Sequence, residues 1–201
     1  MDLWYAPTSP FARKARVVAH ELGLADHLRL IEVDPWTDPR LRALNPLAKV
    51  PTLVLDDGET VWESGLIAER LEYIAGGHGL FPPPGPERWR ALSLQALADG
   101  AATAAGRLFA DENRQPSERS EAMLTRFRRA IDASVDRLEV AELSSSPTIG
   151  EISVAVLLGY LYFRWPARPL LADRPRLDAW YAAFAQRASI LATPYRTREA
   201  G

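Results

Sequence analysis

The sequence predicts an α/β domain followed by an all-α domain. Strand-like and helical segments alternate through residues 1–76, a stretch rich in glycine and proline follows at 77–86, and the long segments of 87–201 have helical periodicity. Alternating strands and helices indicate a mixed sheet with helices packed on it. We therefore expect an α/β domain at 1–76, a linker at 77–86 and a helical bundle at 87–201.

Composition excludes several classes of function. The 201 residues are 47% hydrophobic and carry a net charge of −2, which argues against a nucleic-acid binder that neutralises phosphates. The chain has no cysteine, so disulfides, thiolate zinc sites and a thiol nucleophile of its own are excluded, and no metal is expected. No signal-peptide pattern or membrane-length apolar run is found, so we expect a cytoplasmic protein.

The start of the first helix is the place where we expect the chemistry. Leu3–Ala6 predicts a strand, and Pro10–Leu22 predicts a helix that Gly23 ends. Ser9 stands at the N-cap and Pro10 at the first helical position. Such a helix end offers free N–H groups and the positive end of the helix dipole, which bind an anion such as a thiolate. The alternative is that Ser9 is an ordinary cap.

The rest of the first domain predicts one more strand, a short helix, a hairpin and a longer helix. These elements are Leu28–Val33, Asp38–Leu44, the strands Leu53–Leu55 and Thr60–Trp62, and a helix that Ser64 opens and Gly76 ends. Pro51 stands before the third strand, where its missing N–H is tolerated. Only X–Pro bonds adopt the cis form cheaply, so Val50–Pro51 is a candidate, although trans is the commoner form.

Glu63 and Ser64 form a second corner between a strand and a helix. The N–H groups and the Ser64 hydroxyl suit the carboxylate of a zwitterionic ligand, and Glu63 suits its ammonium group. The alternative is a helix cap with an acidic residue that complements the helix dipole.

The second domain is expected to consist of four helices, at Pro86–Ala110, Ser117–Leu143, Ile152–Phe163 and Arg174–Ser189. The side chains expected on the inward faces of the first two helices are Trp89, Leu92, Ala96, Met123, Phe127, Ile131 and Leu138. Thr148 and Glu151 have the spacing of a capping box. The helix after them is apolar nearly all round, which is typical of a buried central helix.

Four segments, in this order and spacing, resemble segments of the cytosolic glutathione S-transferase family. They are Thr8–Lys14, similar to the active-site segment of a bacterial subgroup, Asn45–Leu53, similar to the segment that ends in a cis-proline, Trp62–Ala68, similar to the Glu/Ser-Ser corner, and Thr148–Ile152, similar to the buried capping box. The resemblance covers essentially the whole chain and implies that the first domain is thioredoxin-like.

The resemblance implies how glutathione would be bound. The Val50 backbone would pair with the cysteinyl part beside a cis Pro51, and Glu63 and Ser64 would hold the γ-glutamyl end. Lys49 would reach the carboxylates of the tripeptide. The further residues in this predicted site are Phe11 and Asp99. The acid at Asp99 would approach the glutamyl ammonium from a second subunit, or alternatively bond within its own helical domain.

Ser9 is our choice for the group that activates the glutathione thiol, because its position combines a hydroxyl with the helix dipole. Tyr5 is the competing candidate, since several classes of the family use a tyrosine at the end of the first strand. A third alternative is that backbone N–H groups suffice. Relatives with cysteine at the Ser9 position reduce thiols through mixed disulfides, so its absence here disfavours thiol-transferase activity.

The resemblance implies a cytoplasmic, homodimeric glutathione S-transferase that conjugates glutathione to a small hydrophobic electrophile in detoxification. The electrophile is expected between the Ser9 edge and the helix Pro86–Ala110, and neither nucleic acid nor membrane is expected as a partner. One alternative is a glutathione-dependent isomerase or lyase, such as a maleylacetoacetate isomerase. Another is a non-catalytic interaction protein that kept the fold.

Overall fold

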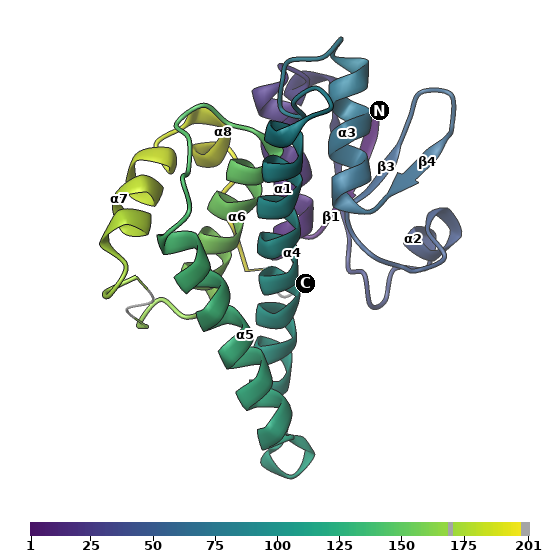
Figure 1. Cartoon of the computed structure of the whole chain (residues 1–201). Coiled ribbons are helices and arrows are strands. Elements are labelled where there is room, and N and C mark those ends of the chain that lie inside the picture. The colour runs from purple at the N-terminus through teal and green to yellow at the C-terminus, as the bar shows by residue number, and fades with distance from the viewer. Residues whose placement is uncertain (169–170, 198–201) are drawn as a thin grey trace. The chain divides into compact units, whose positions relative to one another are not determined.

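The computed structural model of the chain describes residues 1–168 and 171–197. These residues form two compact units (Figure 1). One unit contains Met1–Arg88 and the described residues from Gln186 onward, and the other is Trp89–Ala185. The end of the chain groups with the first unit because helix α8 (Ala188–Leu191) packs against helix α1 (Pro10–Glu21). The sequence had assigned this end to the helical domain.

The first unit contains the expected mixed sheet of four strands. They are β1 (Asp2–Tyr5), β2 (Arg29–Glu32), β3 (Thr52–Val54) and β4 (Thr60–Trp62). The strand order is β2-β1-β3-β4, with β1 parallel to β2 and antiparallel to β3, and β3 antiparallel to β4. The first and third strands begin and end one residue earlier than expected.

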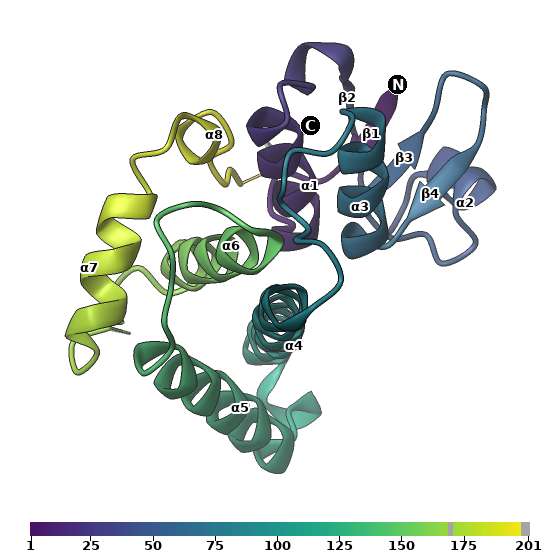
Figure 2. The ribbon, with the colours of Figure 1, turned by 45° about the horizontal axis from the view of Figure 1, so that its top comes forward.

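Helices cover both faces of this sheet. Helices α1 and α3 (Ser64–Ile74) pack side by side, as Figure 2 shows. Arg16 of α1 lies over the ring of Tyr5, whereas Arg40 of α2 (Pro39–Leu44) lies over the ring of Trp4. Successive side chains of a strand point to opposite faces, so α2 covers the face opposite α1. A short 3₁₀ turn, Ala25–His27, follows α1.

The described part of the second unit is helical, as expected. Its helices are α4 (Pro86–Glu112, which begins in the first unit), α5 (Glu121–Glu139), α6 (Ile149–Arg164) and α7 (Pro175–Phe184), with a 3₁₀ turn at Pro116–Glu118. Helix α6 is buried from Ile149 to Leu161, which confirms its prediction as the central helix. No helix within the described ranges is both long and apolar enough to cross a membrane.

Two of the predicted helices differ most clearly from those in the structure. The second long helix begins only after Ser120, whose hydroxyl accepts the N–H of Met123, and so starts later than the expected Ser117. The expected last helix, Arg174–Ser189, is divided into α7 and α8. The backbone is extended at Arg187, whose guanidinium pairs with Glu21 of α1, so a continuous helix cannot form there.

The inward faces of α4 and α5 were partly mispredicted. Trp89 is 69% exposed and Met123 is 40% exposed, whereas Ile131 and Leu138 are buried as expected. Leu124 occupies the buried position beside Met123, because one residue along a helix turns the side chain by about 100°. Of the other expected inward residues, Leu92 and Phe127 are half-buried and Ala96 is exposed. The buried face of α4 consists mainly of small residues: Ala91, Ala98, Ala101, Ala102, Ala104, Ala105 and Leu108.

The capping box at the start of α6 is confirmed. The carboxylate of Glu151 is fully buried and accepts hydrogen bonds from Thr148 N (3.1 Å) and Arg90 Nη2 (3.0 Å). Thr148 Oγ1 accepts the N–H of Gly150. A Cβ atom at Gly150 would lie 2.8 Å from the carbonyl oxygen of Ala91, so α4 and α6 approach each other at backbone distance here.

Candidate functional site

The strand register brings three segments to one edge of the sheet. Trp4 lies opposite Thr52, and Thr52 lies opposite Trp62. The end of β1, the start of β3 and the end of β4 therefore meet at this edge. Three segments are therefore placed at this edge. They are the residues that lead from β1 into α1, the residues just before β3, and the first residues of α3.

Ser9 caps α1 as expected. Its backbone is extended, and its Oγ accepts the N–H of Ala12 at 3.2 Å, with Pro10 at the first helical position. The Ser9 hydroxyl donates its proton to none of the described residues, and the N–H of Phe11 has no acceptor among them. Both Ser9 and Phe11 are half-buried. The start of α1 therefore retains one O–H and one N–H donor, together with the positive end of the helix dipole.

The hydroxyl of Tyr5 is already engaged. It donates to Glu32 Oε2 at 3.1 Å and accepts from Arg196 Nη2 at 3.2 Å, while the ring is buried. These hydrogen bonds to Tyr5 and Glu32 raise the pKa of Arg196 above its ordinary value. Of the two candidate hydroxyls, that of Ser9 keeps its proton available and that of Tyr5 does not.

The peptide bond between Val50 and Pro51 is cis, as the resemblance implied, whereas the residues alone favoured the commoner trans form. Val50 is half-buried, Pro51 is buried and Lys49 is exposed. The Lys49 ammonium forms no ion pair with any residue that the structure describes.

Asn45 and Thr52 hold this segment by hydrogen bonds, a role that was not predicted for either residue. Asn45 is 1% exposed, and its Nδ2 donates to Lys49 O at 3.1 Å and to Thr52 Oγ1 at 3.0 Å. Thr52 is fully buried and donates to the same Lys49 carbonyl at 2.9 Å. The sequence contains these two polar residues seven positions apart, but residue type alone does not predict that both are buried.

The second corner contains a helix capped by a carboxylate. Helix α3 begins at Ser64 as expected, but its N-cap is Glu63, whose φ is +79°. Glu63 Oε2 accepts the N–H groups of Gly65 (2.9 Å) and Leu66 (3.2 Å), and Oε1 accepts the Ser64 hydroxyl at 3.1 Å. The donors that the sequence assigned to a ligand carboxylate thus already bind a carboxylate, that of Glu63.

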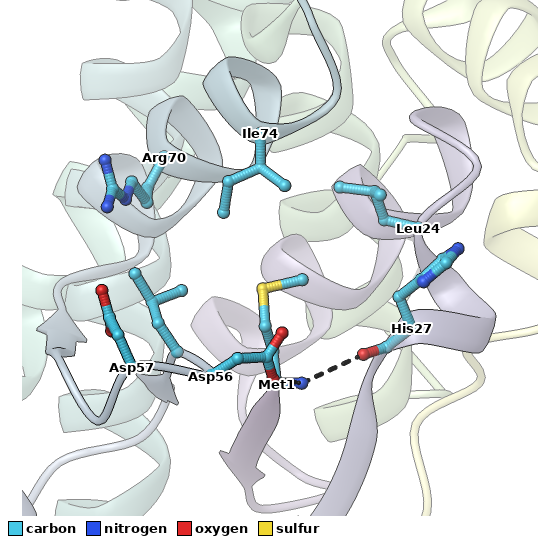
Figure 3. Close-up of a pocket in the computed structure, with 8 residues that line it drawn as sticks. Met1, Leu24, His27, Asp56, Asp57, Arg70 and Ile74 are labelled. Carbon is cyan, nitrogen blue, oxygen red and sulfur yellow. Dashed lines mark hydrogen bonds and ion pairs between the residues drawn. The ribbon is translucent and has the colours of Figure 1, made fainter.

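Two other features belong to other parts of the chain. Asp99 is half-buried in α4, a helix of the second unit. Met1, Leu55 and Arg70 help to line a pocket of about 510 Å³. Figure 3 shows a close-up of this pocket. Met1 precedes β1 and Leu55 follows β3, so this pocket lies at the opposite edge of the sheet. No group of three or more His, Asp or Glu residues in the described ranges could hold a metal ion.

Both parts of the chain match models of one protein family. The N-terminal domain of glutathione S-transferases matches residues 8–74, and the C-terminal domain matches residues 87–183. The chain belongs to the glutathione S-transferase family. The thioredoxin-like domain and the helical domain implied by the resemblance are thereby confirmed for this glutathione S-transferase family member.

Relatives of this glutathione S-transferase family member include the uncharacterized GST-like protein YibF of Escherichia coli K12. It is 33% identical over 183 residues, which cover 88% of this chain and 90% of YibF. A glutathione transferase family member from Pseudomonas fluorescens Pf-5, with bound glutathione, is 38% identical with a TM-score of 0.92, over 98% of this chain and 99% of that chain. A second structure from that organism holds S-(propanoic acid)-glutathione, at 37% identity and a TM-score of 0.89, over 98% and 100% of the two chains.

Proposed function

We propose that this chain is a glutathione S-transferase that joins the sulfur of glutathione to a small hydrophobic electrophile. The observation that carries the proposal is the Ser9 hydroxyl, which caps α1 and keeps its proton for a ligand. It shares one sheet edge with the cis Val50–Pro51 bond and the Glu63 corner. Membership of the family and the glutathione-bound neighbours support glutathione as the ligand.

The proposed reaction depends on keeping the glutathione sulfur ionised. The Ser9 O–H and the Phe11 N–H would donate to the sulfur, and the positive end of α1 would favour its negative charge. The thiolate, which is the better nucleophile, then attacks a carbon of the electrophile. A carbon–sulfur bond forms, and either a leaving group departs with its electron pair or an adjacent carbon takes up a proton.

The γ-glutamyl end of glutathione would bind at the start of α3. We propose that its carboxylate replaces that of Glu63 at the Gly65 and Leu66 N–H groups and at the Ser64 hydroxyl, and that Glu63 then pairs with the ammonium group. The support is that these donors already hold one carboxylate. Val50 would pair its backbone with the cysteinyl part, and Lys49 would reach the carboxylates.

One of the Pseudomonas fluorescens structures supports transfer as the kind of reaction. Its ligand, S-(propanoic acid)-glutathione, is a glutathione whose sulfur is bonded to another group. A thioether of this kind is what a conjugating enzyme releases, whereas an isomerase returns glutathione unchanged.

Product analysis tests the proposal. The purified chain is incubated with glutathione and a panel of aryl halides and unsaturated carbonyl compounds, and the products are identified by mass spectrometry. A thioether that forms faster than without protein, and more slowly with Ser9→Ala, is the expected result. Regenerated glutathione with an isomerised substrate such as maleylacetoacetate would instead indicate the isomerase. If calorimetry detects no binding of glutathione, the result would instead indicate a non-catalytic interaction protein.

We also propose, from the resemblance, that the protein acts as a cytoplasmic homodimer in detoxification and that Asp99 reaches the glutamyl ammonium of the second subunit. Analytical ultracentrifugation tests the dimer. Asp99→Asn is expected to weaken glutathione binding while the dimer persists.

A further inference from the structure

Arg164, in the last turn of α6, has a guanidinium group surrounded by aromatic rings. Its Cζ lies 4.1 Å from the ring centre of Phe109, 4.9 Å from that of Phe163 and 5.2 Å from that of Tyr160. The side chain is half-buried, and its Nε is fully buried without a hydrogen-bond partner. The two Nη atoms, which also have no hydrogen-bond partner among the described residues, are open to solvent.

The Arg164 side chain forms no hydrogen bond or ion pair with any residue in the described ranges. A carboxylate does lie in this part of the unit, since Glu112 follows Phe109 by one helical turn on α4. Glu112 already accepts hydrogen bonds from Trp165 Nε1 (2.9 Å), Arg128 (3.1 Å) and Arg168 (3.1 Å).

These three hydrogen bonds keep the Glu112 carboxylate ionised and use its oxygens as acceptors. Burial acts to raise the pKa of Glu112, but the hydrogen bonds from Trp165, Arg128 and Arg168 outweigh it and hold the pKa below its ordinary value. The ring of Trp165 contacts Phe109 edge-on at 6.2 Å, so the Glu112 group and the Arg164 group form one cluster. Of the three arginines in this cluster, Arg128 and Arg168 pair with the Glu112 carboxylate and Arg164 does not.

A half-buried cation without a counter-charge is costly, and aromatic faces offset only part of that cost. The open Nη edge of a guanidinium matches a carboxylate with two parallel hydrogen bonds. The surrounding rings lower the local dielectric constant, which strengthens such a pair, and they offer contact to an apolar group. We infer that Arg164 is the anion-binding residue of a site for a small organic carboxylate with an aromatic or apolar body. The site lies within Trp89–Ala185 and does not depend on glutathione.

Arginine side-chain NMR of the full chain tests the inference directly. The Nε–H of Arg164 is buried, so its proton exchanges slowly, and its signal is assigned by its loss in Arg164→Gln. In chloride-free buffer, benzoate is expected to shift this signal saturably, and the neutral isostere benzamide is not. Inorganic phosphate separates recognition of a carboxylate from recognition of any anion. No shift with benzoate, or an equal shift with benzamide or phosphate, would overturn the inference.

Binding of benzoate to the variants provides the second test. Arg164→Gln is expected to weaken binding about tenfold or more, since a charge-assisted pair is lost. Arg129→Gln, which removes an equal charge from the exposed surface of α5, is the matched control and is expected to leave binding unchanged. If Arg164→Gln does not fold, Arg164→Lys keeps the charge but not the planar fork and is expected to bind more weakly. Equal binding by the wild type and a folded Arg164 variant would mean that the residue is purely structural.

Discussion

The Ser9 hydroxyl accepts a hydrogen bond from the backbone N–H of Ala12 at 3.2 Å, one turn into helix α1. A hydroxyl that accepts through its oxygen still has its proton to donate. One side chain can therefore cap the helix and stabilise a sulfur anion at the same helix end. Tyr5, whose hydroxyl is held by Glu32 and Arg196, lacks this freedom.

Ser9→Ala is expected to raise the pKa of bound glutathione. Loss of a hydrogen bond to a charged group costs about 1.5–3 kcal/mol, which corresponds to roughly one to two pKa units. At neutral pH we expect turnover to fall about tenfold or more, because less thiolate is present. The measurement is the pH dependence of kcat/KM.

The controls for this prediction are Ser9→Thr and Tyr5→Phe. The first restores a hydroxyl at the cap and is expected to recover most of the activity, while the second is expected to leave the pH profile in place. A shifted profile in Tyr5→Phe together with an unshifted one in Ser9→Ala would reverse the assignment.

Glu63→Gln is expected to weaken glutathione binding about tenfold, because the pair with the glutamyl ammonium loses its charge. The effect on kcat is expected to be smaller, since Glu63 is assigned to binding and not to the sulfur. Calorimetry gives the affinity, and saturation kinetics give kcat. Glu59→Gln removes an equal charge from an exposed carboxylate that pairs with Arg70 at 3.0 Å, and serves as control. Unchanged affinity in Glu63→Gln would remove this residue from the site.

Glu21 is expected to contribute to the pH dependence of stability. Burial acts to raise its pKa, but hydrogen bonds from Arg187 and Ser189 outweigh burial and lower it below the ordinary value of 4.5. A lowered pKa in the folded state means that the contribution is fully present above about pH 4.5 and is lost as the pH falls through the folded-state value. Urea unfolding of Glu21→Gln is expected to show a loss of about 1–3 kcal/mol near neutral pH.

The difference between the wild type and Glu21→Gln is expected to shrink in acid. Glu69→Gln breaks the exposed pair with Arg88 and is expected to cost less than about 1 kcal/mol. A Glu21→Gln difference that is constant from neutral to strongly acidic pH would contradict this account of the Glu21–Arg187 contact.

Gly150→Ala is expected to destabilise the second unit. Its Cβ would lie 2.8 Å from Ala91 O and 2.9 Å from Leu94 Cβ, so α4 must move away from α6. Overpacking of this kind costs about 1–3 kcal/mol. Gly100→Ala, at an exposed position of α4, meets no atom within 4 Å and is expected to stabilise the helix by up to about 1 kcal/mol. Thermal unfolding measures both, and a neutral Gly150→Ala would show that α4 shifts freely.

Features encoded by neighbouring residues could be predicted from the sequence. The caps at Ser9 and Thr148 depend on residues within one turn, so their patterns were sufficient. The division of the last helix was not predictable, because it follows from Arg187 pairing with Glu21, 166 residues away. The inward face of α4 was missed because alanines carry little hydrophobic contrast and their orientation is set by the approach of α6.

In the candidate site, too, the features that depend on the folded structure could not be predicted from the sequence. The residue types at Ser9 and Glu63 indicated anion and ammonium binding, but the hydrogen bonds that Glu63 forms within its own corner required the positive φ seen only in the structure. The clamp formed by Asn45 and Thr52 depends on burial, which neither residue type predicts.

The central claim is that the start of α1 keeps the glutathione sulfur ionised. Ultraviolet absorbance of the thiolate, recorded for the complex across a pH titration, tests this claim most directly. We expect bound glutathione to ionise well below the ordinary thiol value of about 8.5, and Ser9→Ala to move it back toward that value. A bound sulfur that titrates at its ordinary pKa in the wild type would contradict the claim.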